Sequence, residues 1–169
     1  MPMPGRAIEY LRGEHNDLRN LIAQYRRSED NTTRRKLFDR IRDMMELHDE
    51  VEMQLFYPAV AEAGSDDVKA LIDEARAEHR GVVDLIADIG DVASDATNPR
   101  FRTAMDALLV DIEDHLGHEE TWIFPVAQQT LTREALDRLG REMDRMKLAA
   151  DDRIDHISRS SAPGMERLI

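Results

Sequence analysis

The chain has 169 residues, a length that suits one domain with a buried apolar core. It contains no cysteine, which excludes disulfides, zinc–thiolate sites, iron–sulfur clusters and a cysteine nucleophile. The formal net charge is −12, and an acidic surface repels nucleic acid phosphates and anionic lipid headgroups, so neither nucleic acid nor membrane is expected as a partner. No apolar run approaches the ~20 residues that span a bilayer and no secretory signal is visible, so the expected location is the cytoplasm.

Apolar residues recur at helical spacing in long segments, and short polar stretches with glycine, proline or capping residues separate these segments. The predicted helices cover about residues 5–25, 33–63, 66–89, 99–124 and 132–157. Pro58 should kink or loosen the end of the second helix, because proline cannot donate a backbone hydrogen bond. The pattern predicts an all-α fold, an antiparallel up-down four-helix bundle with an additional C-terminal helix. Residues 1–157 would form this domain, and residues 158–169 a mobile tail.

An internal repeat relates the first two predicted helices to the next two. The matching stretches are Glu14-His15 with Glu78-His79, 64 residues later, and His48-x3-Glu52 with His115-x3-Glu119, 67 residues later. In both copies an aromatic residue and a proline follow, as Tyr57-Pro58 and Phe124-Pro125. The repeat predicts two helical hairpins, each with a histidine on its first helix and a His-x3-Glu pair on its second.

The spacing within each His-x3-Glu pair has a physical reason. Residues four apart lie one turn apart on the same face of a helix, so His48 and Glu52 can reach one point in the interior, as can His115 and Glu119. If the hairpins face each other, four imidazoles and two carboxylates converge. This donor set suits iron, manganese or zinc, and not calcium. Two glutamates bridging two metal ions, with terminal histidines, would use all six donors.

These motifs resemble those of the hemerythrin-like, or HHE cation-binding, domain family over about residues 8–128. In that family a first-helix His, a His-x3-Glu before an aromatic-Pro, a Glu-His and a His-x3-Glu-Glu before Phe-Pro hold a di-iron site. The resemblance implies two iron ions with a bridging oxo, hydroxo or solvent ligand. The implied protein ligands are His15, His48, Glu52, His79, His115 and Glu119.

Two positions depart from the oxygen-carrying hemerythrins. Those proteins have a second histidine one turn after the third-helix histidine, where this chain has Val83. They also have an aspartate five residues after the fourth-helix histidine, where this chain has Glu120 directly after Glu119. The set of four histidines and two glutamates is more similar to variant hemerythrin-like proteins, which weakens the expectation of stable reversible oxygenation.

Each of three polar side chains near the predicted ligands has two possible roles. Tyr57 could supply a phenolate ligand or a redox-active neighbour, although ideal helical angles point it away from His48. Asp111, one turn before His115, could orient an imidazole or face solvent. His118 is a candidate extra ligand, with plain surface exposure as the alternative.

An apolar collar is expected around the ligands, where it would exclude water. Its predicted members are Leu18, Ile22, Leu55, Val82, Val83, Ile86 and Trp122, each with core packing as the alternative. Asp49 and Glu120 adjoin ligand positions and are expected to be solvated.

Three classes of function remain open for such a site: reversible binding or sensing of O2 or nitric oxide, redox turnover of hydrogen peroxide or O2, and iron buffering. The missing histidine favours chemistry with hydrogen peroxide or O2, in oxidative stress or iron and oxygen homeostasis. The sequence leaves open whether the protein is a catalase-like or oxidase enzyme, and it assigns no residue a catalytic role.

Overall fold

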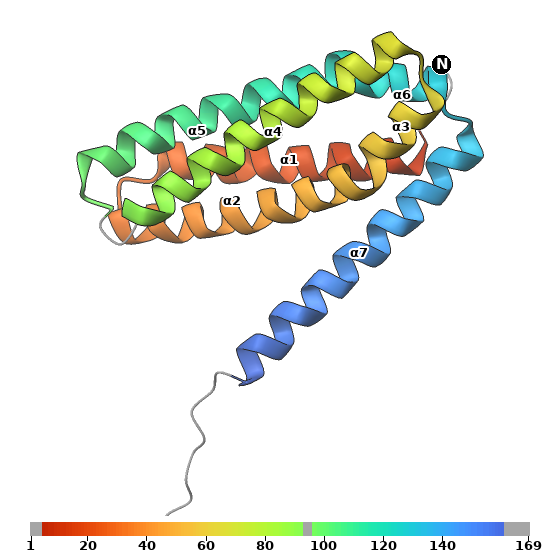
Figure 1. Cartoon of the computed structure of the whole chain (residues 1–169). Helices are drawn as coiled ribbons and strands as arrows, with labels where there is room; N and C mark the ends of the chain where they lie inside the picture. Colours follow the sequence, from red (N-terminus) through yellow and green to blue (C-terminus); the bar gives the residue numbers. More distant parts are fainter. Residues whose placement is uncertain (1–4, 93–95, 161–169) are drawn as a thin grey trace, which may run out of the picture.

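The computed structural model describes residues 5–92 and 96–160, and side-chain surroundings up to residue 152 (Figure 1). Its elements, in chain order, are α1 (Arg6–Arg27), α2 (Asn31–Val51), η1 (Glu52–Phe56), α3 (Tyr57–Ala63), α4 (Asp66–Val92), α5 (Pro99–His118), η2 (Glu119–Ile123), α6 (Phe124–Thr130) and α7 (Arg133–Ser160). Every element in the described residues is helical, and η1 and η2 are single π-helical turns. The last helix extends three residues beyond the predicted end at 157, and the rest of the predicted tail lies outside the described residues.

Local sequence signals explain where the helices begin. The Asp30 side chain caps α2 by accepting a hydrogen bond from the Thr33 backbone N–H at 2.7 Å. Asn98 caps α5 in the same way through the Arg100 N–H at 2.9 Å, and Pro99 takes the first helical position, where its missing N–H costs nothing. Two aspartates in the first turn of α4 interact favourably with the positive end of its dipole.

The four long helices α1, α2, α4 and α5 lie side by side as two hairpins, α1–α2 and α4–α5, which confirms the predicted bundle (Figure 1). Two apolar clusters fill the interior. One, with Leu18, Met45 and Leu116, lies toward one end of the long helices, and the other, with Leu11 and Val51, lies toward the opposite end. The predicted ligands fall between these clusters along each helix, so the polar site sits between two layers of apolar packing.

The predicted C-terminal helix is α7, which packs mainly on α1 and also contacts α2 and η1. Its apolar face buries Leu136 and Met143 in the cluster that contains Leu11. Gly140 permits close approach, since a Cβ there would lie 2.7 Å from the backbone carbon of Arg6. The additional helix therefore covers the first hairpin.

The two π turns are the feature of the backbone that the sequence analysis did not predict. Each follows a His-x3-Glu pair and precedes an aromatic-Pro pair, and in each the aromatic N–H bonds to the glutamate carbonyl five residues earlier: Tyr57 to Glu52, and Phe124 to Glu119. Proline cannot donate a backbone hydrogen bond, and its ring collides with the carbonyl four residues before it in a regular α-helix. A wider turn just before Pro58 and Pro125 avoids that collision, so a bulge stands where a kink or a loosened end was expected at Pro58, and a second bulge precedes Pro125.

Among the residues that the structure describes, no helix combines the length and apolar character needed to cross a membrane.

Candidate metal centre

All six predicted ligands converge in the interior. Each is at most 2% exposed, and together they come from α1, α2, η1, α4, α5 and η2. Two overlapping groups of four ligand atoms lie within 4.8 Å of one another, one from His48, Glu52, His79 and His115 and the other from His15, His48, Glu52 and Glu119. The buried histidine–glutamate cluster expected from the repeat is therefore present.

The distances between the donor atoms are those of ligands around a metal ion, and several of these atoms lack a hydrogen-bond partner. The Nε2 atom of His15 lies 3.2 Å from Glu119 Oε2, that of His48 lies 3.3 Å from Glu52 Oε2, and that of His115 lies 3.5 Å from Glu119 Oε2. Atoms that bind one ion at about 2.1 Å lie roughly 3 to 3.5 Å from each other. These three Nε2 atoms, Glu52 Oε1 and Glu119 Oε2 are buried without a hydrogen-bond partner. Unpartnered buried polar atoms are costly, and cations between them would offset that cost.

The imidazoles fall into two pairs that match the two hairpins. The ring centroids of His15 and His48 are 5.2 Å apart, and those of His79 and His115 are 4.3 Å apart. Glu52 and Glu119 approach histidines of both pairs: Glu52 Oε2 is 2.7 Å from His79 Nε2 and 3.3 Å from His48 Nε2. If two ions bind, each histidine pair would hold one, and Glu52 and Glu119 are placed to contact both.

Each imidazole also has a carboxylate at its other ring nitrogen, Nδ1. The Nδ1 atoms of His48 and His115 lie 3.1 and 3.0 Å from Glu14 and Glu78. A carboxylate can only accept, so Nδ1 carries the hydrogen, and in the neutral imidazole Nε2 keeps its lone pair for a metal. Glu14 and Glu78 were not assigned a role from the sequence, although the repeat of Glu-His in both copies was a visible signal.

Glu120 is hydrogen-bonded to His15 and Asp49 forms an ion-pair contact with His79, which corrects the expectation that both carboxylates are simply solvated. Asp49 Oδ1 lies 2.9 Å from His79 Nδ1, and Glu120 Oε1 lies 2.8 Å from His15 Nδ1. Glu120 also accepts a hydrogen bond from Arg19. Neither residue has an acidic counterpart in the other hairpin, so the repeat gave no sign of this role. The two hairpins thus reach the same arrangement with carboxylates from different positions.

Tyr57 points into the cluster. Its hydroxyl oxygen lies 2.5 Å from Glu119 Oε1, 3.1 Å from Glu52 Oε2 and 3.0 Å from His79 Nε2. The π turn places Tyr57 one turn after Glu52 on the same face, which ideal α-helical angles would not do. Burial and the charges of Glu52 and Glu119 raise the pKa of Tyr57 well above its usual value, so the metal-free site holds a neutral phenol.

The equivalent position in the other copy carries no hydroxyl. There Phe124 stacks on His15, with ring centroids 5.3 Å apart. A polar oxygen therefore adjoins the His79–His115 pair, and an aromatic hydrocarbon adjoins the His15–His48 pair. The two histidine pairs therefore have chemically different surroundings in spite of the repeat.

Protons occupy the metal-free cluster. Burial lowers the pKa of His48, but the charges of Glu52 and Glu119 and the hydrogen bond that His48 donates to Glu14 outweigh it and raise the pKa to about 9. Burial likewise opposes protonation of His79, while Asp49 and Glu52 raise its pKa to about 10. Burial also opposes ionisation of Glu119, yet neighbouring imidazoles hold its pKa far below the usual value. Protonated His48 and His79 thus offset the charge of the buried carboxylates when no cation is bound.

The predicted apolar collar is correct only in part. Leu18, Ile22, Val82 and Ile86 are buried in the apolar cluster beside the site, whereas Leu55 is half-buried and packs on the opposite cluster. The prediction for Trp122 is wrong, since its side chain is 59% exposed and Ile123 is buried instead. Residues advance less around the axis in a π turn than in an α turn, so the interior position moves by one residue.

Val83 is likewise not part of the collar, because its side chain is 43% exposed. It lies four residues after His79 on a regular helix, but the bundle interior on this stretch of α4 is reached by Val82 and Ile86. The position that carries an additional histidine in the oxygen carriers therefore faces outward in this chain.

Asp111 is exposed and makes no described contact with an imidazole, which favours its solvent-facing reading. His118 lies outside the ligand groups, and its Nδ1 is 2.8 Å from Glu78 Oε1. Glu78 therefore connects His118 to His115. Burial raises the pKa of Glu78, but the two imidazoles outweigh this effect and lower the pKa below its usual value.

Comparison with known proteins gives relatives over most of the chain. The Mycobacterium tuberculosis protein Rv2633c is 27% identical over 139 residues, which cover 81% of this chain and 82% of that protein. A Nostoc protein described as a DNA nickase is 24% identical over 147 residues, and the chain spans 40% of its length. The crystal structure of a hemerythrin HHE cation binding domain-containing protein, the Rv2633c homolog from Mycobacterium kansasii, superposes with a TM-score of 0.74. That match has 24% identity and covers 92% of this chain and 93% of the other, which shows a shared fold.

The match to a protein family covers both the helical bundle and the residues of the buried cluster. Residues 6–127 match the hemerythrin HHE cation binding domain, and residues 72–159 give a second, overlapping match. The first range contains both hairpins and all six predicted ligands. The chain therefore belongs to the hemerythrin HHE cation-binding domain family.

Proposed function

We propose that the chain is a non-haem di-iron protein that acts on or binds small oxygen-derived molecules, hydrogen peroxide or O2. The observation that carries the proposal is the set of buried, unpartnered Nε2 and carboxylate oxygen atoms between four helices, with a carboxylate at every Nδ1. The proposed ligands are His15 and His48 for one ion, His79 and His115 for the other, and Glu52 and Glu119 for both. A bridging oxo, hydroxo or solvent ligand would complete the centre.

Iron is favoured over zinc by the family resemblance and by two glutamates placed to bridge, since affinity order alone favours zinc or copper at nitrogen and oxygen donors. A pair of iron ions would exchange two electrons, which matches the reduction of one hydrogen peroxide to two waters and the oxidation of a second hydrogen peroxide to O2. The protein's own groups would exclude bulk water, fix the orientation of the imidazoles and keep the carboxylates ionised. Hydrogen peroxide and O2 are the proposed partners, in preference to nucleic acid or membrane.

Tyr57 supports chemistry at one ion in particular. Its hydroxyl lies among the donors at the His79–His115 pair, where it could donate a hydrogen bond to Glu119 or, after losing its proton, bind the ion. Either role would block or modify one open position, which favours reaction over simple reversible oxygen storage. The alternative function is reversible binding of O2 or nitric oxide, or iron buffering, without turnover.

The test is the metal content and visible spectrum of protein purified without added metal, followed by addition of hydrogen peroxide. Two irons per chain with rapid O2 evolution are expected, and Glu119→Gln should lose iron because one bridge is removed. Tyr57→Phe should keep both irons but change the spectrum and the peroxide rate. A stable, reversible spectral change without O2 evolution would favour the binding alternative, and wild-type protein without iron at normal helicity would refute the proposal.

A further inference from the structure

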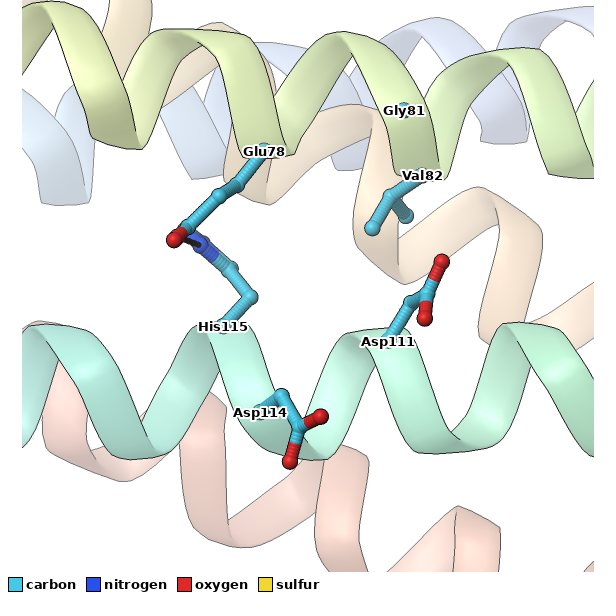
Figure 2. Close-up of a pocket in the computed structure, with 6 residues that line it drawn as sticks. All are labelled: Glu78, Gly81, Val82, Asp111, Asp114 and His115. Carbon is cyan, nitrogen blue, oxygen red and sulfur yellow. Dashed lines mark hydrogen bonds and ion pairs between the residues drawn. The ribbon is translucent and has the colours of Figure 1, made fainter.

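A pocket of about 220 Å³ opens between α4 and α5 beside the cluster (Figure 2). Its lining residues are Glu78, Gly81 and Val82 from α4, and Asp111, Asp114 and His115 from α5. Gly81, Asp111 and Asp114 are exposed and form its mouth, whereas Val82 and His115 are at most 2% exposed and form its floor.

His115 connects the pocket to the metal centre. Its Nδ1 faces Glu78, as the close-up shows, and its Nε2 lies on the opposite side of the ring, 3.5 Å from Glu119 Oε2 (Figure 2). One imidazole ring therefore lines the pocket and also contributes a proposed ligand atom. Only side chains such as those of His115 and Val82 separate a small molecule in the pocket from the cluster.

The repeat shows why the pocket lies in the second hairpin. Asp17 occupies the position of Gly81 in the first hairpin, and Met44 and Leu47 occupy those of Asp111 and Asp114. Met44 and Leu47 are partly buried and pack on the two apolar clusters. The missing side chain at Gly81 and the outward aspartates leave space that apolar side chains fill in the other copy.

The additional helix strengthens this difference. Because α7 packs on α1 and contacts α2, the outer face of the first hairpin is covered. Leu47 shares an apolar cluster with Leu136 and Met143 of α7. The pocket is lined by α4 and α5 alone, on the hairpin opposite to that cover.

We propose that this pocket is the route by which small uncharged molecules, hydrogen peroxide among them, reach the metal centre. The inference rests on the proposed function. Carboxylates of Glu78, Asp111 and Asp114 can accept hydrogen bonds from the O–H groups of peroxide, and Gly81 and Val82 add an apolar surface. The same carboxylates repel anions at short range, so the route selects against charged ligands.

Blocking the mouth tests the route. A Cβ at residue 81 would meet nothing within 4 Å, and leucine favours helix over glycine, so Gly81→Leu should fold and retain iron. Nitric oxide is a suitable uncharged probe, and its association with the reduced, iron-loaded protein can be followed by stopped-flow absorbance. Gly81→Leu should slow association by about tenfold or more, since a filled cavity excludes even small molecules. The matched control is Gly13→Leu on α1, which also has nothing within 4 Å and should react as wild type does.

Charge selection is tested with azide, a small anion, on the oxidised protein. Asp111→Asn should speed azide association by about threefold, because one charge near the mouth is removed, and leave the nitric oxide rate unchanged. Asp17→Asn is the control, since Asp17 is an exposed carboxylate on α1, in the hairpin without the pocket.

The outcomes separate this inference from the proposed function. Equal nitric oxide rates in Gly81→Leu and wild type, or equal slowing in Gly13→Leu, would overturn the route while leaving the di-iron function intact. Asp111→Leu fills the same space from α5 and should repeat the slowing if Gly81→Leu does not fold. Equal azide rates in wild type and Asp111→Asn would overturn the selection against anions, and wild-type protein without iron would refute the proposed function and the route together.

Discussion

The carboxylates behind the imidazoles fix what each histidine can do. Asp49 contacts His79 at 2.9 Å from α2, and Glu14 contacts His48 at 3.1 Å from α1, so helices are linked through ligand pairs. A hydrogen bond at Nδ1 sets the tautomer and increases the basicity of the Nε2 donor. Metal affinity should therefore depend on residues that touch no metal.

Asp49→Ala should lower metal affinity by about 10- to 100-fold, because His79 loses its fixed orientation and its negative partner. Competition with a chelator of known affinity measures the change. The control is Asp43→Ala, which removes an exposed carboxylate paired with Arg42 on the same helix. Equal affinity in both variants would show that His79 is oriented by packing alone.

At the scale of secondary structure, the π turns and α7 determine which residues face the site. The π turn of residues 52–56 brings Tyr57 to the cluster and that of residues 119–123 turns Trp122 outward. An extra residue in one turn shifts every later position on the helix, so no periodicity argument based on a regular helix could place these side chains. The proline after each turn was the available signal, and only Pro58 was interpreted, as a kink or a loosened helix end.

The helix α7 should contribute to the stability of the whole domain. Met143 is fully buried against the first hairpin, so Met143→Ala should lower the free energy of unfolding by about 2–5 kcal/mol. Leu148 on the same helix is 64% exposed, and Leu148→Ala should change it by less than about 0.5 kcal/mol. Denaturant titration measures both, and a small effect for Met143→Ala would mean that α7 packs only loosely on the bundle.

For the whole molecule, the buried charges couple metal binding, folding and pH. In the metal-free protein the pKa of His48 is about 9 and that of His79 about 10, against 6.5 for an unperturbed imidazole. The folded state thus holds these protons more tightly than the unfolded state. Their contribution to stability is fully present below pH 6.5 and is lost as pH rises through 9 to 10.

Metal-free protein should therefore lose stability between neutral pH and pH 10, whereas metal-loaded protein should not lose this contribution, because cations replace the protons. Metal affinity should rise over the same range, since protons compete for the imidazoles. Thermal unfolding with and without chelator, across this range, gives both quantities. Parallel pH profiles for the two forms would contradict the exchange of protons for metal.

The sequence by itself determined the helices, the hairpin repeat and the buried histidine–glutamate cluster. These follow from local rules, because apolar periodicity and the one-turn spacing of His48 and Glu52 or His115 and Glu119 act within single helices. The repeat then indicated which helices pair, so residues far apart in the chain could be assigned to one site from the sequence alone.

Only the tertiary structure decided which carboxylate lies behind each imidazole, where Tyr57 and Trp122 point, and which hairpin carries the pocket. Asp49 and Glu120 act on histidines of other helices, so their role depends on helix placement and not on neighbours in sequence. The two π turns change side-chain direction without changing composition. The cover of α7 on the first hairpin distinguishes two copies that the repeat makes look equivalent, because long-range packing is not encoded in any local pattern.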